Sequence, residues 1–411
     1  MQKIIEIFNK HLYPISLYAR QVAGTVVLLV IARYLSVYDY GIFSSYKAIC
    51  GFILTIACLG YNEYILVSSQ KNMENVSQKI TLFLSNAFVI LFITALISAF
   101  SPIEYHCIFI LVLLRTFFDS TFFSLILPYF QASKTLKVIA KINIIYSLLV
   151  ISITILSYIL KLSLLKFLLM SCFIGLTNFI HCSKYSKTKY FDFIMRPVFY
   201  IKLIDKSIWG YVGVIIAFLL YSQIPSLFVS SYLEKEQAAL YFSAFTIASI
   251  IGLLITAQNQ KIVPEMIKAS TIKVQHLIKQ NFKFIMLINA FIFIIFLLFG
   301  KSLLTLIYGQ EYYSNGYYLL LIFTISNISL ALANIFGAYI TASGNQHLKI
   351  KYQILAIVIS ILTLLLTYKY GIYSAALAYL LSSSYIGIAY MQKTKQLLNT
   401  NIKENTWNSK N

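Results

Sequence analysis

Acidic residues are scarce in this chain of 411 residues, which has 13 Asp and Glu against 33 Lys and Arg. Polar connecting sequence is also scarce, because hydrophobic residues make up 59% of the chain and charged residues only 11%. This composition lies far outside that of soluble globular domains, and no gap between apolar stretches is long enough to form one. Any function must therefore be carried out within a lipid bilayer.

The sequence also lacks motifs for catalysis or metal binding. Its histidines are scattered without metal-ligand spacing, and there is no Gly-rich phosphate loop or nucleophile elbow. Most of its five cysteines fall inside apolar stretches, so no disulfide framework is indicated. We therefore predict a protein that is not an enzyme and has no metal site or cofactor, and leave coupling to a Na⁺ or H⁺ gradient open.

About twelve apolar stretches are long enough to cross a hydrocarbon core as helices, which takes about 20 residues at about 1.5 Å each. They predict an all-α polytopic membrane protein. The stretches cover residues 12–35, 41–67, 80–100, 103–128, 138–160, 162–181, 207–231, 238–260, 282–300, 317–341, 350–368 and 372–391.

Lysine and arginine concentrate in alternate gaps between these stretches, which orients the chain with both termini in the cytoplasm by the positive-inside rule. Since the cations flank membrane spans instead of covering one soluble face, the high positive charge does not indicate a nucleic-acid partner. The segments assigned to the outside, which include the ends of the adjoining stretches, hold only Arg33, Lys161, Lys166, Lys235, Lys301 and Lys369.

The longest basic gap lies at the midpoint and predicts two six-helix bundles. The bundles cover residues 1–182 and 207–391, joined by a cytoplasmic linker over 183–206 and followed by a cytoplasmic tail over 392–411. Such halves would be parallel repeats, and GIFSSYKA at 41–48 aligns weakly with LYFSAFTI at 240–247. The apolar spacing in 261–283 fits an amphipathic helix along the inner interface, although a solvated basic loop is an equal alternative.

Four charged residues are the clear candidates for a charge buried within a predicted span, where each costs about 2.5 to 3.5 kcal/mol unless it has a partner or a role. Arg115 and Asp119 are four residues apart and can neutralise each other on one helix face. Arg20 and Lys47 have no acidic neighbour on their own helices, so each either snorkels towards a headgroup region or lines a cavity. A cavity with these cations would suit an anionic headgroup, because a guanidinium clamps phosphate oxygens through two donors.

Other residues support weaker hypotheses. Glu63 either titrates in ion coupling or pairs with a cytoplasmic lysine, and Pro225 lies mid-span as a hinge candidate. Polar residues in the second half either bond sugar hydroxyls or join helices: Gln223, Gln258, Asn259, Asn289, Asn327 and Asn334. A tyrosine run either stacks on sugars or forms an interfacial belt: Tyr308, Tyr312, Tyr313, Tyr317 and Tyr318.

Three segments resemble bacterial polysaccharide-export flippases of the O-antigen (Wzx) type. The segment 31–67 reads IARYLSVYDYGIFSSYKAICGFILTIACLGYNEYILV. Residues 306–353 contain LIYGQEYYSNGYYLLLIF and ITASGNQHLKIKYQ, and residues 371–384 read GIYSAALAYLLSSS. The resemblance implies the V-shaped, two-bundle fold of the multidrug/oligosaccharidyl-lipid/polysaccharide (MOP) superfamily.

The resemblance further implies transport of oligosaccharide repeat units on undecaprenyl pyrophosphate across the bacterial plasma (inner) membrane by alternating access. It also implies a central cavity lined by cationic side chains, a role that Arg20, Lys47 and Arg115 could fill in this sequence. Expected partners are the lipid-linked glycan, membrane lipids, a polysaccharide polymerase and a chain-length regulator. A multidrug extruder and a membrane polymerase or ligase are the alternatives, and the choice among O-antigen, capsule and exopolysaccharide stays open.

Overall fold

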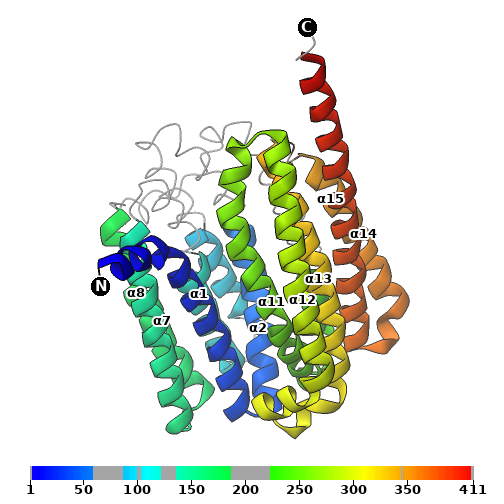
Figure 1. The fold of residues 1–411 in the computed structure, drawn as a ribbon. Helices are drawn as coiled ribbons and strands as arrows, with labels where there is room; N and C mark the ends of the chain where they lie inside the picture. The colour runs from blue at the N-terminus through cyan, green and yellow to red at the C-terminus, as the bar shows by residue number, and fades with distance from the viewer. Residues whose placement is uncertain are drawn as a thin grey trace. The chain divides into compact units, whose positions relative to one another are not determined.

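The computed structural model describes residues 2–58, 87–99, 103–121, 136–186, 223–343, 345 and 347–408. Within these ranges every regular element is helical (Figure 1), which confirms the all-α prediction. The chain separates into two compact units, Met1–Leu219 and Leu220–Asn411.

Unit 1 contains long helices and one widened helical turn. Beyond the labelled helices, residues 87–98 are also helical. α1 and α7 pack against each other along unit 1, as Figure 1 shows. The labelled elements are α1 (Gln2–Tyr34), α2 (Val37–Cys58), α5 (Ile103–Thr116), the π-helix η1 (Phe117–Thr121), α7 (Leu136–Ile159) and α8 (Leu164–Ser186).

Unit 2 begins, within the described residues, with a helix over 223–232. It continues through five long helices and two short 3₁₀ turns. These are α11 (Lys235–Lys268), α12 (Thr271–Tyr308), η3 (Gln310–Tyr312), α13 (Tyr313–Ala342), α14 (His347–Thr367), η4 (Tyr368–Tyr370) and α15 (Ile372–Asn408).

Each of the twelve predicted stretches contains a described helix. Among the described residues, six helices are long and apolar enough to cross a membrane, and two shorter apolar helices span Val22–Tyr34 and Ala87–Ser98. The six are Lys137–Ile159, Leu164–Cys182, Thr271–Tyr308, Asn315–Ala342, His347–Tyr370 and Ile372–Asn399.

The exposed surface of α12 explains why these helices need a bilayer. A row of large apolar side chains on this helix faces outward, whereas the buried row on its other side packs within unit 2. In water such a surface would favour aggregation, but lipid acyl chains solvate it. The exposed row includes Phe284, Leu287, Phe291, Ile294 and Leu298.

The connection between α11 and α12 differs from both sequence interpretations. Residues 261–283 form neither a separate interfacial helix nor a solvated loop. They belong to two long helices, because α11 continues to Lys268 and α12 begins at Thr271. The two residues between them have extended backbone at both helix ends. The amphipathic spacing therefore reflects two long helices that meet at a corner, with Val274 and Ile278 buried on the inner side.

The two units share an order of helix contacts. In unit 1, α2 packs on α5, α5 on α8 and α7 on α8. In unit 2, α11 packs on α13, α13 on α15 and α14 on α15. The aligned Phe43 and Phe242 are both buried, as are Ser44 and Ser243. This correspondence supports the repeat hypothesis, which stays a prediction.

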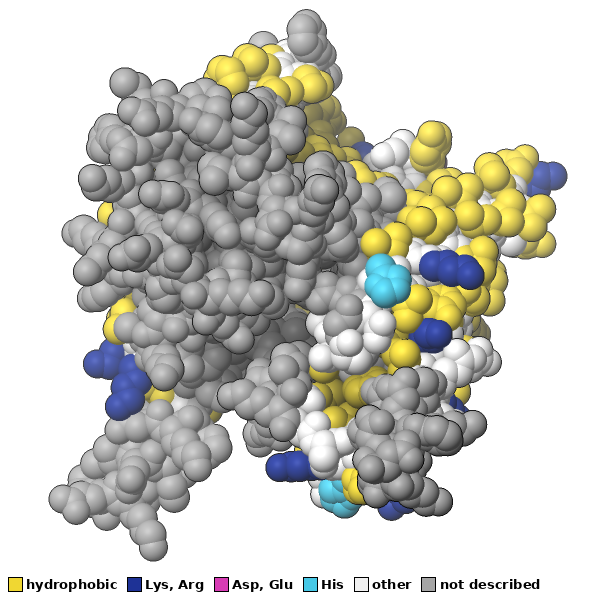
Figure 2. All heavy atoms as spheres, turned by 90° about the horizontal axis from the view of Figure 1, so that it is seen from above, with side chains coloured by type: hydrophobic (Ala, Val, Ile, Leu, Met, Phe, Trp, Pro, Cys, Tyr) yellow, Lys and Arg dark blue, Asp and Glu magenta, His cyan; other side chains and the backbone are white. Residues whose placement is uncertain are grey.

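The predicted linker and the predicted tail are described only in part. Most of 183–206 lies outside the described residues, and the predicted tail begins as a continuation of α15, which runs to Asn408. Figure 2 views the molecule from above, and the coloured side chains on that face include Lys, Arg and His but no Asp or Glu. The described basic side chains are of the kind that the positive-inside rule expects at a cytoplasmic end, and the orientation stays a prediction.

Candidate functional site

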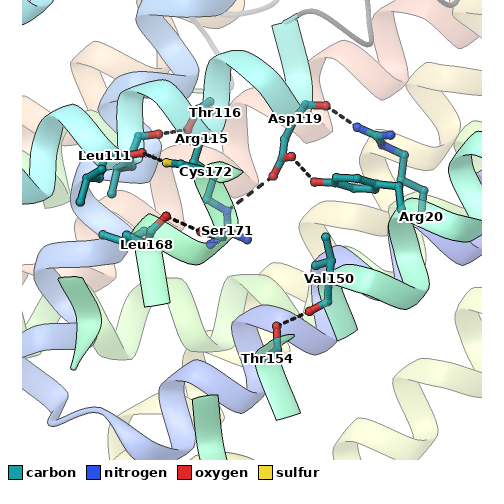
Figure 3. A network of polar contacts seen from close by, with 12 residues as sticks. Arg20, Leu111, Arg115, Thr116, Asp119, Val150, Thr154, Leu168, Ser171 and Cys172 are labelled. Atoms are coloured by element: carbon teal, nitrogen blue, oxygen red, sulfur yellow. Dashed lines mark hydrogen bonds and ion pairs between the residues drawn. The ribbon is translucent and has the colours of Figure 1, made fainter. Parts of the chain in front are cut away.

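Three of the four candidate charged residues come together in unit 1. Arg20 lies on α1, Arg115 near the end of α5, and Asp119 in the π turn η1 that follows. Figure 3 shows the guanidinium of Arg20 pointing at the backbone carbonyl of Asp119, while the Asp119 carboxylate points towards Arg115. The structure thus joins residues that are 99 positions apart in the chain.

Arg20 is held by polar and aromatic contacts. Its Nη2 donates to the carbonyl oxygen of Asp119 at 2.7 Å, and its Nη1 donates to Oδ1 of Asn143 at 3.3 Å. Its guanidinium carbon lies 4.3 Å from the centre of the Tyr146 ring, a cation–π geometry. Arg20 therefore does not snorkel to a headgroup region, since its charged end binds α7 and the π turn.

Arg115 forms the predicted pair with Asp119. Its Nε lies 3.5 Å from Oδ2 of Asp119, and the two side chains are 13% and 23% exposed. The guanidinium also faces the rings of Phe43 and Phe167, at 6.0 and 5.2 Å. Its Nη1 is buried and has no hydrogen-bond partner in the described part of the chain. One donor of Arg115 is therefore left for a group that this network does not supply.

The π turn places Asp119 at the centre of the network. A π turn widens the helix and disturbs its regular hydrogen-bond ladder, so a backbone carbonyl becomes accessible to an outside donor such as Arg20. The Tyr146 hydroxyl donates to Oδ1 of Asp119. Gly175 on α8 lets this turn pack closely, because a Cβ there would lie 2.9 Å from the Cβ of Phe118 and 3.6 Å from Oδ1 of Asp119.

Lys47 differs from the two arginines. It lies on α2 close enough to Arg115 and Asp119 for their charges to act on it. Its side chain is exposed, and it forms no hydrogen bond or ion pair with the residues that the structure describes. Lys47 therefore adds a third basic side chain beside the network. Three cations and one carboxylate leave this part of unit 1 electropositive.

The remaining predicted residues fall elsewhere. Glu63 lies outside the described residues. Pro225 is buried in the helix over 223–232 of unit 2, and its role as a hinge stays a prediction. Among the described residues, no group of three or more His, Cys, Asp or Glu side chains is placed to hold a metal ion.

Polar residues of unit 2 divide into packed and accessible sets. Asn289 is 1% exposed, and neither its oxygen nor its nitrogen has a hydrogen-bond partner among the described residues. Tyr308 and Tyr312 are buried with ring centres 5.2 Å apart, whereas Tyr318 is 58% exposed. The tyrosine run therefore serves partly as helix packing and partly as exposed aromatic surface.

Asn143 and Tyr146 were not singled out by the sequence interpretation. Both lie on α7, three residues apart and hence on one helical face. Asn143 also donates through Nδ2 to Oγ of Ser16 at 3.5 Å on α1. A polar face within an apolar stretch was the available signal, but nothing in the sequence identifies α1 as its partner.

Known structures share this fold at low sequence identity, which shows the fold alone. A MOP superfamily transporter from Pyrococcus furiosus matches with a TM-score of 0.63 and 12% identity, over 95% of this chain and 98% of that chain. A eukaryotic MATE transporter matches at 0.62 and 11%, over 98% and 99%. A multidrug resistance MATE transporter in an inward-facing conformation matches at 0.60 and 9%, over 93% and 96%.

The fold defines a polytopic helical membrane protein, and it is similar to the folds of MOP superfamily and MATE transporters. Comparison with curated protein sequences gives no match. The model of the family described as polysaccharide biosynthesis protein matches residues 12–270. The chain belongs to that family, and this confirms the resemblance drawn from its sequence segments.

Proposed function

We propose that this protein flips oligosaccharide repeat units linked to undecaprenyl pyrophosphate from the cytoplasmic to the outer face of a bacterial plasma membrane. The glycan supplies O-antigen, capsule or exopolysaccharide synthesis. Both termini lie in the cytoplasm, and the two bundles alternate access to the headgroup while the polyprenyl tail stays in lipid. No covalent bond changes during this cycle.

The observation that carries the proposal is the electropositive network of unit 1. Lys47 adds a basic side chain that makes no hydrogen bond or ion pair with the described residues, and Nη1 of Arg115 is buried without a described partner. Pyrophosphate oxygens accept charge-assisted hydrogen bonds from such donors, and low-dielectric surroundings strengthen them. Arg20 contributes positive charge, while its bonds to Asp119 and Asn143 fix the position of the network.

A multidrug extruder is the nearest alternative, because two of the structures compared above are MATE transporters and one is named for multidrug resistance. The three cations against one carboxylate argue against a cationic drug, which an electropositive site repels. For the Pyrococcus furiosus transporter, reverse polarity of the binding pocket suggests a different function. This superfamily fold is therefore compatible with cargo other than that of the multidrug transporters.

Deletion of the gene in its source bacterium tests the proposal. We expect complete lipid-linked repeat units to accumulate, protected from enzymes added outside, while surface polysaccharide disappears. Mass spectrometry of extracted lipids measures the accumulation. Units that accumulate but are accessible from outside would indicate a polymerase, and an unchanged lipid pool with altered drug sensitivity would indicate an extruder. A wild-type copy of the gene must restore the surface polysaccharide.

A further inference from the structure

A small pocket lies at one end of unit 2, at the end that the charge distribution predicts to face outward. Its volume is about 270 Å³. Its walls come from the first turns of α11, α13 and α15 and from the 3₁₀ turn η4, so three separate connections of the chain meet there. The lining residues are Gln237, Leu240, Asn315, Lys369, Tyr370, Gly371, Ile372 and Tyr373.

The pocket combines carboxamides with tyrosines. Tyr373 donates its hydroxyl hydrogen to Oδ1 of Asn315 at 3.5 Å, a long contact that leaves the amide nitrogen of Asn315 without a partner among the described residues. The side chain of Gln237 makes no hydrogen bond with any described residue. Tyr370 is 68% exposed, so one ring of the lining is open to a ligand.

Gly371 allows Gln237 to face the pocket closely. Its φ of +56° is a left-handed conformation that favours glycine. A Cβ at this position would lie 3.4 Å from Oε1 of Gln237, in contact with the amide. The turn therefore brings a free carboxamide beside an exposed tyrosine without an intervening side chain.

We propose that this pocket is a sugar-binding subsite that holds one ring of the transported glycan at the outer face. Carboxamides offer a donor and an acceptor to neighbouring hydroxyls of a sugar ring. A tyrosine ring covers the apolar C–H face of the same ring and presents a polar edge. The volume lies below the range of about 300 to 1,000 Å³ of drug-sized sites, which fits one ring and not an oligosaccharide.

This subsite rests on the proposed function, since it assigns a second contact to the same cargo. It also separates the recognition of the glycan from that of the pyrophosphate. The cationic network belongs wholly to unit 1, and the subsite belongs wholly to unit 2. Lys369 in the lining predicts that an acidic sugar binds better than its neutral counterpart.

Saturation-transfer NMR on the purified full chain tests the subsite. The protein is held in lipid nanodiscs, because many detergents carry sugar headgroups. The probes are glucose, galactose, N-acetylglucosamine and glucuronic acid. Gln237→Ala and Tyr370→Ala remove pocket groups that the fold does not depend on, and Tyr232→Ala is the matched control because this tyrosine is 80% exposed in the same unit and does not line the pocket.

We expect at least one sugar to receive saturation from the wild-type protein and each pocket variant to weaken its binding at least tenfold. Tyr232→Ala should leave the signal unchanged. Absence of signal for all four sugars, or equal loss in Tyr232→Ala, would overturn the subsite.

The deletion experiment distinguishes the two proposals. Lipid-linked units that accumulate without any sugar signal remove the subsite and leave the flippase function. A sugar signal confined to the pocket, without lipid accumulation, keeps the sugar site but removes the transported glycan as its physiological ligand.

Discussion

Replacement of Arg20 separates the role of its charge from that of its hydrogen bonds. Arg20→Lys keeps the charge but has a single ammonium for two separate acceptors. Arg20→Gln removes the charge but keeps a carboxamide that can donate to one acceptor. Arg20→Ala removes both. If the charge attracts the pyrophosphate, export should follow the order Arg, Lys, then Gln and Ala together.

The structure sets the scale of the stability loss. Arg20 donates two hydrogen bonds between helices and lies over the Tyr146 ring. Interhelical polar contacts in membranes contribute about 0.6 kcal/mol each and at most about 1.7, and a cation–π contact adds about 0.5 to 1 kcal/mol. Arg20→Ala should therefore destabilise unit 1 by about 2 kcal/mol. This corresponds to a Tm lower by about 4 to 8 °C for a unit of this size.

Two assays are read on the same variants. A thiol-reactive fluorophore measures Tm, because unfolding of unit 1 exposes the buried Cys50 and Cys182. Surface polysaccharide in a complemented deletion strain measures export. We expect Arg20→Gln to be about as stable as Arg20→Lys but to export far less. Wild-type export by Arg20→Gln, or export that simply tracks Tm across all three variants, would refute a charge-based role for Arg20.

Three further predictions concern the same unit. Asp119→Asn retains an acceptor for the Tyr146 hydroxyl but removes the only carboxylate of the described network. Calorimetry on the purified protein should therefore show pyrophosphate binding at least tenfold tighter than in the wild type, and weaker binding would contradict this. Gly175→Ala places a Cβ too close to the Cβ of Phe118 at the π turn, so it should lower the stability of unit 1 by about 1 to 3 kcal/mol and lower its Tm. The control Gly24→Ala has nothing within 4 Å of its Cβ and should not lower Tm. Lys47→Met should abolish export without lowering Tm. Lys301 is an exposed lysine of unit 2, so the control Lys301→Met should export normally. Equal export by the two variants would show that Lys47 is not part of the site.

Apolar length and helical spacing made much of this fold predictable. Each apolar stretch contains a helix because a bilayer leaves no other way to satisfy the backbone of a single segment. The Arg115–Asp119 pair was predictable because residues four apart on a helix lie on one face. Both inferences depend only on neighbours along the chain.

The rest depends on contacts between distant segments. The hydrogen bond from Arg20 to the carbonyl of Asp119 requires the packing of α1 on α7 and the π turn at Asp119. No residue pattern in the sequence predicts that turn. Asn143 and Tyr146 join the site only because α7 faces α1. The corner at residues 269–270 was missed because amphipathic spacing looks the same in an interfacial helix and in a span that extends beyond the bilayer.

Reconstitution with its own cargo tests the flippase function most directly. Lipid-linked units purified from the deletion strain are placed in liposomes with the purified protein, and an impermeant glycosidase then measures which units are accessible from outside. We predict that the protected inner-leaflet pool becomes accessible with the wild-type protein and stays protected with Arg20→Gln. A pool that stays protected with correctly folded wild-type protein would contradict the flippase function.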